Sequence, residues 1–218
     1  MKFLTLSKFL LILMVPFLLF LLVLNFGAFD SLFFREKFSE YKVEQKVPQA
    51  ILLHEKVINF ITGKNNELPN DFNDREKKHL WDVRNIVRIS TILLYTLVIL
   101  FVLLLLISAS ILKVNNFITN FAGKVLVFGG FLTIMLASAL FFLINSDFSA
   151  AFESFHKLFF QQGTYSFDPA KEIIVNLYPE QLFMDIGIRI SKWVVVASSV
   201  VMLLGPLSAL VVDENQRS

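Results

Sequence analysis

Three histidines, His54, His79 and His156, are the side chains of this 218-residue chain best suited to proton transfer. An unperturbed imidazole has a pKa near 6.5, so it can accept and return a proton at neutral pH. The chain contains no cysteine, which excludes a disulfide framework, a thiol nucleophile and a thiolate metal site. Any chemistry therefore falls to imidazoles, carboxylates, hydroxyls or the backbone.

Two of these histidines follow a glutamate, in Glu76-x-x-His79 and Glu153-x-x-His156. This spacing occurs on two helices of di-iron carboxylate bundles, but such a site also needs two further inward-facing glutamates. The apolar segments of this chain offer none, so chance spacing is the simpler interpretation. We therefore predict no metal site, and acid–base catalysis by His79 and His156 remains as a hypothesis.

Known hydrolase motifs are missing from the sequence. There is no G-x-S-x-G stretch, and "HEKVI" at His54 fails the H-E-x-x-H zinc pattern because Ile58 stands at the second ligand position. We interpret His54 as a surface or loop-packing residue.

The composition is that of a membrane protein. Hydrophobic residues make up 56% of the chain, which includes 25 phenylalanines and only 8 glycines. The formal net charge is +2, and lysines and arginines are dispersed among acidic residues without a basic stripe. A nucleic-acid partner is therefore not expected.

Four apolar segments are long enough to cross the hydrocarbon core, which takes roughly 20 helical residues. They are Phe9–Phe29, Ile89–Leu112, Val125–Ile144 and Trp193–Val212. We interpret the first as a retained anchor, because no clear A-x-A cleavage site follows it. The predicted organisation is a first span (1–29), a loop or cap (30–88), two spans with a short loop (89–144), a second loop (145–192) and a last span with its tail (193–218).

The charges beside these segments predict the topology. Lys2 and Lys8 flank the first span, and the short loop between the second and third spans carries Lys113 and Lys124 without an acid. Because lysines and arginines in short flanks stay in the cytoplasm, both termini are expected there. The two long loops, which carry all three histidines, then face the extracytoplasmic side. In the third span, Gly129, with Thr133 and Ala137, predicts a close helix–helix contact.

The first long loop predicts mainly helices. Tyr41, Val43 and Val47 alternate as a weak strand signal, which allows a short β element. Pro48 to Gly63 suits a helix, and Asn73 followed by Glu76 is a capping-box pattern that starts another helix near Asp74. His79 lies ten residues before Ile89 on that helix, or roughly 15 Å, which is near the headgroup layer.

The second long loop begins with an amphipathic segment. Phe148, Phe152, Phe155 and Phe159 recur at helical spacing, and Gly163 follows as a stop, so an interfacial helix carrying His156 is expected. Farther along, prolines at Asp168-Pro169 and Tyr178-Pro179 predict two helix starts. The predicted fold is therefore an integral membrane protein, mainly α, with four transmembrane helices capped by a small extracytoplasmic domain.

Several blocks resemble a known family. "HLWDVRNIVR" at residues 79–88, with "FHKLFF", "YSFDP" and "IIVNLYPEQLF" between residues 155 and 183, is similar to the lipoprotein intramolecular transacylases. These are four-span membrane proteins of Gram-positive bacteria, and the similarity extends over nearly the whole chain. One departure is Tyr165, at a position where a tryptophan is expected.

The resemblance implies an activity and a site. Such an enzyme moves the sn-2 acyl chain of a diacylglyceryl-cysteine lipoprotein to the α-amino group of the same cysteine and leaves an N-acyl lyso-form. The implied partners are this diacylated lipoprotein and membrane lipids, and no external cofactor is required because donor and acceptor belong to one molecule. By motif position, the implied catalytic residues are His79 and His156, at the extracytoplasmic face of the cell membrane.

The residues support hypotheses about individual roles. An α-amine has a pKa near 8 and must lose a proton to attack, so His156 is expected to act as base. His79 would protonate the departing alkoxide or stabilise the oxyanion, and the two roles could be exchanged. Asp82 is a candidate for orienting an imidazole, and Arg84 for binding an anion or for a structural ion pair. Tyr165 and Asp168 are candidate supporting or substrate-binding residues.

Two other classes of function stay open at this point. One is a metal-dependent or hydrolytic lipid-modifying enzyme that uses the Glu-x-x-His pairs. The other is a non-enzymatic lipid-binding membrane module, with its phenylalanine-rich helix seated in the interface.

Overall fold

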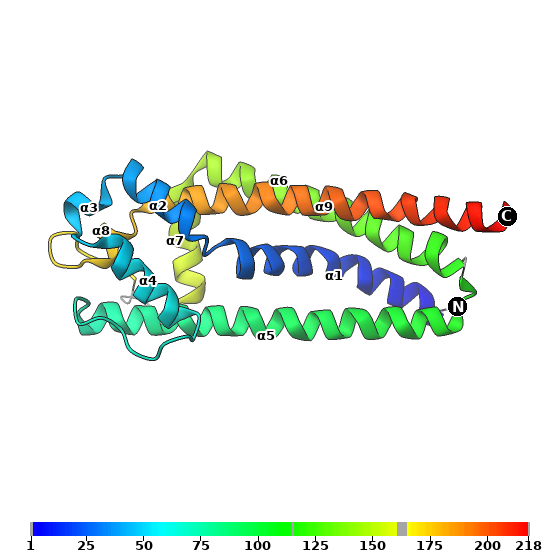
Figure 1. The fold of residues 1–218 in the computed structure, drawn as a ribbon, viewed down its shortest axis with the longest axis horizontal. Helices are drawn as coiled ribbons and strands as arrows, with labels where there is room; N and C mark the ends of the chain where they lie inside the picture. The colour runs from blue at the N-terminus through cyan, green and yellow to red at the C-terminus, as the bar shows by residue number, and fades with distance from the viewer. Residues whose placement is uncertain (1, 115, 161–164, 218) are drawn as a thin grey trace. The chain divides into compact units, whose positions relative to one another are not determined.

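The computed structural model describes residues 2–114, 116–160 and 165–217, with side chains as far as residue 206. Every regular element in this part of the chain is a helix, as Figure 1 shows. The elements are α1 (Lys2–Gly27), α2 (Ser31–Glu40), α3 (Val43–Lys46), α4 (Ala50–Ile61), α5 (Asp74–Ile111), η1 (Asn116–Ala122), α6 (Gly123–Ser146), α7 (Phe148–Phe159), α8 (Ile174–Leu177) and α9 (Glu180–Arg217).

The chain divides into two compact units. Residues 2–24, 92–142 and 189–217 form the first, which we call the membrane unit. Residues 25–91 and 143–188 form the second, which we call the histidine unit because it contains all three histidines. The long helices α5 and α9 each contribute residues to both units.

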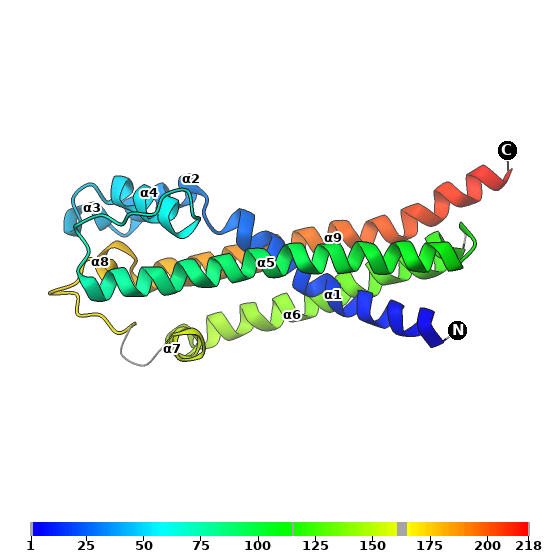
Figure 2. The same cartoon turned by 90° about the horizontal axis from the view of Figure 1, so that it is seen from below.

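The membrane unit consists of long apolar helices that run alongside one another (Figure 2). Four helical stretches are long and apolar enough to cross a bilayer: Lys2–Gly27, Asp74–Ile111, Asn116–Ser146 and Glu180–Pro206. Large apolar side chains such as Leu106, Phe128 and Leu203 are exposed on them. Hydrocarbon is the environment that suits such a surface, so the four predicted spans and the membrane fold are confirmed.

Small residues bring the helices of the membrane unit close together. A Cβ added to Gly129 would lie 2.6 Å from a methyl carbon of Val15, and Thr133 and Ala137 on the same helix are fully buried. The predicted close-contact stripe is therefore confirmed, as expected where backbones approach each other between apolar helices.

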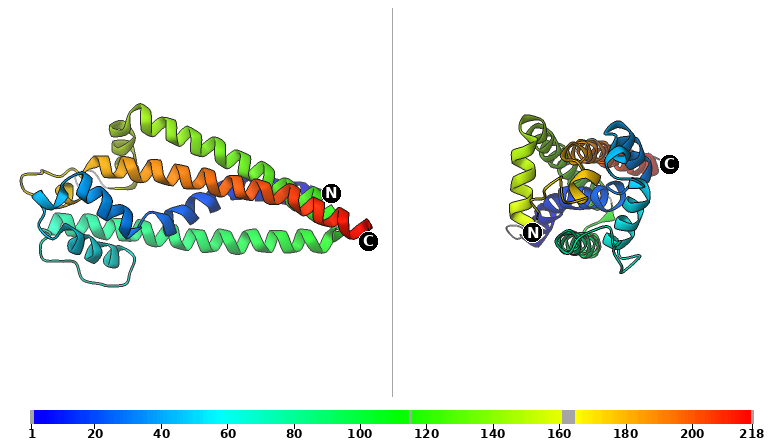
Figure 3. Two further views of the ribbon diagram at one scale, coloured as in Figure 1. Left: turned by 45° about the horizontal axis from the view of Figure 1, so that its top comes forward. Right: turned by 90° about the vertical axis from the view of Figure 1, so that its left-hand side faces the viewer.

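The histidine unit has its own apolar core, to which α2, α3, α4, α8 and the first turns of α5 and α9 contribute buried side chains. The buried members of this core are Phe34, Phe38, Val43, Val47, Ala50, Leu53, Val57, Phe60, Ile61, Phe72, Leu80, Ile174, Leu177 and Leu182. Helix α7 lies crosswise to α5 in this unit (Figure 3). The core thus fixes the first turns of α5, on which His79 lies.

The predicted β element is wrong. Val43–Lys46 forms the short helix α3, and Tyr41 closes α2 by donating its backbone N–H to Lys37. Val43 and Val47 are four residues apart, a separation that fits both the period of two of a strand and one turn of a helix. Both are buried, with exposed fractions of 1% and 5%. A single helical turn buries both side chains on one face, and the core beneath it selects that turn.

Other local predictions agree with the structure, except for the helix start predicted at Asp168-Pro169. Helix α4 ends before Gly63, which adopts a φ of 79°. α7 begins at Phe148, and the predicted stop at Gly163 lies outside the described residues. The two proline sites differ: α9 starts directly after Pro179, whereas Asp168-Pro169 opens only a hydrogen-bonded turn before α8.

The contact between Gly123 and Gly205 makes the membrane unit sensitive to a single methyl group. A Cβ on Gly205 would lie 2.9 Å from the carbonyl oxygen of Gly123, which is backbone and cannot move aside like a side chain. We expect Gly205→Ala to cost about 1–3 kcal/mol by overpacking, and thermal unfolding in detergent should show a lowered Tm. Ser199→Ala, at an exposed position of α9, is the matched control. Equal Tm values for the two variants would contradict the close contact.

Candidate functional site

Two histidines from distant parts of the chain meet in the histidine unit. The rings of His79 on α5 and His156 on α7 are nearly parallel, with centroids 6.3 Å apart and an interplanar angle of 18°. Both residues are buried, each with an exposed fraction of 8%. The structure therefore brings together the two residues that the sequence predicted as catalytic.

His79 is placed by the start of α5. Asn73 accepts hydrogen bonds through Oδ1 from the backbone N–H groups of Arg75 and Glu76, each at 3.0 Å, which is the predicted capping box. Leu80, the residue after His79, is buried in the core. The His79 ring itself packs against Phe160 at 4.6 Å and Phe167 at 5.3 Å between centroids.

His156 is placed by α7, whose first turn is capped by Asp147 through a 3.0 Å hydrogen bond from the Ala150 N–H. Nδ1 of His156 lies 2.7 Å from the carbonyl oxygen of Phe152. A carbonyl oxygen can only accept, so Nδ1 donates its proton and Nε2 carries the lone pair. The ring of His156 therefore offers a basic nitrogen at a defined position.

The surroundings of both rings favour the neutral imidazole. His79 lies ahead of the apolar stretch that begins at Ile89, and its burial, assisted by the nearby His156, lowers its pKa to about 4. Burial also lowers the pKa of His156, although the Phe152 carbonyl and the Glu180 carboxylate oppose this shift. Both shifts have the sign expected for bases in an apolar site. Of the two, His156 has the environment of the stronger base.

The polar atoms of His79 are less satisfied than those of His156. Nδ1 of His79 is buried and has no hydrogen-bond partner among the described residues. Buried nitrogen atoms of this kind usually have a hydrogen-bond partner. The pair thus combines one basic nitrogen with one unpaired buried nitrogen, inside a shell of aromatic rings.

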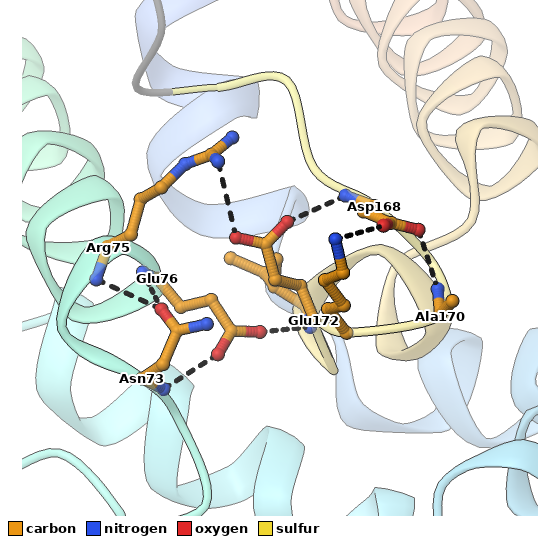
Figure 4. Close-up of polar contacts among 8 residues, drawn as sticks. Asn73, Arg75, Glu76, Asp168, Ala170 and Glu172 are labelled. Carbon is orange, nitrogen blue, oxygen red and sulfur yellow. Dashed lines mark hydrogen bonds and ion pairs between the residues drawn. The ribbon is translucent and has the colours of Figure 1, made fainter.

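The segment that begins at Tyr165 completes this shell. The Tyr165 ring lies 5.2 Å from the His156 ring, and Phe167 covers His79. Figure 4 shows how the following residues are held: the Glu76 carboxylate accepts from the backbone N–H groups of Asn73 at 2.7 Å and Ile174 at 2.8 Å. Sequence reasoning found the capping box but missed its second partner, since Ile174 is 98 residues away.

The other predicted supporting residues make no contact with the imidazole rings of His79 and His156. Asp82 is partly exposed and makes no hydrogen bond with either imidazole. The Arg84 guanidinium donates to the Asn65 carbonyl at 3.1 Å and to Oδ1 of Asn66 at 2.8 Å, and it lies over aromatic rings. These hydrogen bonds hold the segment between α4 and α5 against α5.

Asp168 shapes the turn that follows Phe167. Its Oδ1 accepts from the Ala170 N–H at 2.9 Å, and its Oδ2 pairs with Lys171 at 3.4 Å. Of the four supporting candidates, only Tyr165 contacts a histidine ring.

His54 occupies a different place in the same unit. Its exposed fraction is 4%, its ring lies 4.0 Å from that of Phe34, and Nδ1 shares a 3.1 Å hydrogen bond with the Tyr178 hydroxyl. Burial lowers the pKa of His54 to about 4. His54 is thus a packing residue, but the predicted location at the surface or in a loop is wrong, because His54 is buried on α4.

The two Glu-x-x-His pairs do not converge on one point. The Glu76 carboxylate is occupied by two backbone N–H groups, and Glu153 is exposed and paired with Lys157 at 2.7 Å. Within the residues described, no group of three or more histidines, aspartates or glutamates is arranged to hold a metal ion.

Solved structures share this fold. A membrane-integral lipoprotein intramolecular transacylase from Bacillus cereus matches with a TM-score of 0.79 and 21% identity over 98% of both chains. The same protein with a histidine-to-arginine mutation matches with a TM-score of 0.77 and 20% identity, over 98% of this chain and 94% of that one. A comparison with curated proteins found no match.

The family comparison covers both histidines of the pair. Residues 9–183 match the model for "Lipoprotein intramolecular transacylase Lit", which is most of the chain and includes the blocks around His79 and His156. The resemblance in the sequence is therefore confirmed. The chain belongs to the lipoprotein intramolecular transacylase family and is a multi-pass membrane enzyme that acts on lipoproteins.

Proposed function

We propose that His79 and His156 catalyse the transfer of the sn-2 acyl chain of a diacylglyceryl-modified N-terminal cysteine to the α-amino group of that cysteine. The observation that carries this proposal is the stacked, buried pair of imidazoles, in which one tautomer is defined by a backbone hydrogen bond. Neutral imidazoles at such a site can move protons at ambient pH.

In the proposed reaction one proton moves from the α-amine to His156 and then to the departing glyceryl oxygen. The α-amine attacks the ester carbonyl carbon and forms the new C–N bond, while Nε2 of His156 takes one proton from the nitrogen. The tetrahedral intermediate then collapses, and the bond between the acyl carbon and the glyceryl oxygen breaks. The His156 imidazolium returns its proton to that oxygen, so the products are an amide and a free hydroxyl.

The environments of the two rings favour this division of roles. His79, with a pKa lowered to about 4, is a weak base that stays neutral at physiological pH. A neutral imidazole keeps one N–H that can donate a hydrogen bond. We assign this donor role to the one N–H of the neutral His79 ring, because a preorganised donor in a dry site stabilises developing charge strongly. His156 is then the base.

The substrate supplies both nucleophile and acyl donor. The enzyme therefore has to hold amine and ester together, and well-oriented intramolecular reactions reach effective molarities on the order of 10⁵ M or more. In this scheme no side-chain nucleophile, metal or cofactor takes part. Tyr165, which packs against His156, is the residue that we assign to contact with the substrate.

The location of the reaction follows from the membrane topology. The lysines at 2, 8, 113 and 124 support cytoplasmic termini, which assigns the histidine unit to the extracytoplasmic face. Helix α7 exposes Phe155, Leu158 and Phe159, with exposed fractions of 47%, 76% and 50%. Such a face suits the boundary between headgroups and acyl chains, where the diacylglyceryl group of the substrate lies.

Removal of either ring tests the assignment. We expect His156→Ala to lower the transacylation rate by about 10²–10⁴-fold because the base is lost, and His79→Ala by about 10²–10³-fold because an oxyanion donor is lost. The measurement is mass spectrometry of the N-terminal lipopeptide. With the unaltered enzyme, its total mass should be unchanged and one acyl group should have moved from glycerol to nitrogen; with either variant this product should form more slowly.

His54→Phe is the control for these variants, since it removes a buried histidine that does not contact the pair. It should lose stability, because it leaves the Tyr178 hydroxyl without its partner, but retain activity. Full activity of His156→Ala in folded protein would contradict the proposed mechanism.

The pH dependence gives an independent test. The α-amine must be neutral, so log kcat/KM should rise with a slope near 1 up to about pH 8, the usual pKa of this group. The pKa of His156 is lowered, so its base form persists below pH 6.5, and the slope should steepen only in that more acidic range. Activity that falls as pH rises through 7 would require a protonated imidazole and would contradict this scheme.

A further inference from the structure

Two buried carboxylates of the histidine unit have no part in the proton transfers. Glu76 has an exposed fraction of 1%, and Glu172 of 6%. Glu172 accepts from the backbone N–H of Asp168 at 2.6 Å and pairs with Arg75 at 3.6 Å. Burial of a carboxylate is unfavourable unless hydrogen bonds compensate it, so these two side chains are expected to have specific roles.

Both carboxylates act on one segment, residues 165–177, which we call the strap. Figure 4 shows Asp168 and Glu172 of the strap beside Arg75 and Glu76 in the first turn of α5. The Glu76 carboxylate accepts a hydrogen bond from the backbone N–H of Ile174. The Arg75 guanidinium, one residue earlier, lies 5.1 Å from the centre of the Phe167 ring. The start of α5 therefore contacts the strap through a hydrogen bond, an ion pair and a cation–π contact.

The strap carries two of the rings that cover the catalytic pair. Phe167 meets His79 edge-on with centroids 5.3 Å apart, and Tyr165 lies 5.2 Å from His156. Both rings precede the anchored residue Ile174 in the chain. The position of the strap thus sets how closely the imidazoles are covered.

We propose that Glu76 is a positioning residue for the transacylation: its carboxylate joins the helix that carries His79 to the strap that covers both imidazoles. The proposal rests on the proposed roles of His79 and His156. Glu76 does not touch the reacting atoms, and it acts through the strap.

The chemistry of this position selects a carboxylate. A capping box requires a single acceptor at this point of the helix, and glutamine serves as well as glutamate there. Here two backbone donors, from Asn73 and Ile174, converge on the two oxygens of Glu76. A glutamine offers one acceptor oxygen and one NH₂ group, so it satisfies one donor and opposes the other with a second donor.

Two variants separate the role of Glu76 in capping α5 from its role in binding the strap. Glu76→Gln keeps the size of the side chain and can keep the hydrogen bond to the Asn73 N–H, but it loses the bond to Ile174. Asn73→Ala removes the Oδ1 cap of α5 and leaves the Glu76 carboxylate and both backbone donors in place. If the role of Glu76 is only to stabilise the helix start, the two variants should behave alike.

The first readout is the titration of the histidines, measured by NMR on folded full-length protein with labelled imidazoles. In Glu76→Gln the rings lose part of their cover, so the pKa of His79 should rise from about 4 toward the ordinary value of 6.5. In Asn73→Ala it should stay low. The other titratable groups that face the pair, Glu180 and Tyr165, are unchanged in both variants.

The second readout is catalysis. We expect Glu76→Gln to lower kcat by about tenfold or more with little change in KM, because misplacement of catalytic groups slows the chemical step. Asn73→Ala should keep its kcat even where its Tm is lowered. Equal titration curves and equal kcat in the two variants would overturn the proposal.

A third variant covers the case in which Glu76→Gln does not fold. Phe167→Leu removes the ring that the strap places on His79 while it leaves the strap backbone intact, and it should raise the pKa of His79 in the same way. An unchanged His79 titration in this variant would also overturn the proposal. An active His156→Ala together with shifted titrations in Glu76→Gln would instead contradict only the catalytic roles.

Discussion

Two hydrogen bonds to one buried carboxylate link distant segments of the histidine unit. Glu76 joins the backbone at the start of α5 to the backbone of Ile174, so two segments that are far apart in the sequence are held at a fixed distance. His79 lies on the first segment, and the rings of Tyr165 and Phe167 lie just before the second. A buried carboxylate needs hydrogen bonds to compensate the loss of water, so these two bonds, together with the apolar core, favour the observed position of both segments.

The apolar shell around the imidazoles has a physical consequence for their charge. Aromatic rings surround His79 and His156, and burial is the largest cause of the lowered pKa of each. A single positive charge in this shell also disfavours a second one on the neighbouring ring. The pair is therefore suited to hold one proton briefly, which is what an acyl transfer between neutral groups needs.

Local patterns predicted most of the helices, and their limits have clear causes. The capping box at Asn73 and the phenylalanine spacing of α7 depend on neighbours in the chain, and both predictions agree with the structure. Val43 and Val47 fit a strand and a helical turn equally well, and only the core beneath them decides between the two. The second partner of Glu76 could not be predicted, because the contact with Ile174 is formed by tertiary packing alone.

The hydrogen bond from His156 to the carbonyl of Phe152 lies within a single helix. In many enzymes a carboxylate from another part of the fold selects the tautomer of a catalytic histidine. Here the tautomer of His156 is set within α7 itself, because the donor and the acceptor are one helical turn apart. Movement of α7 would therefore change the distance between the two rings without changing which nitrogen presents its lone pair.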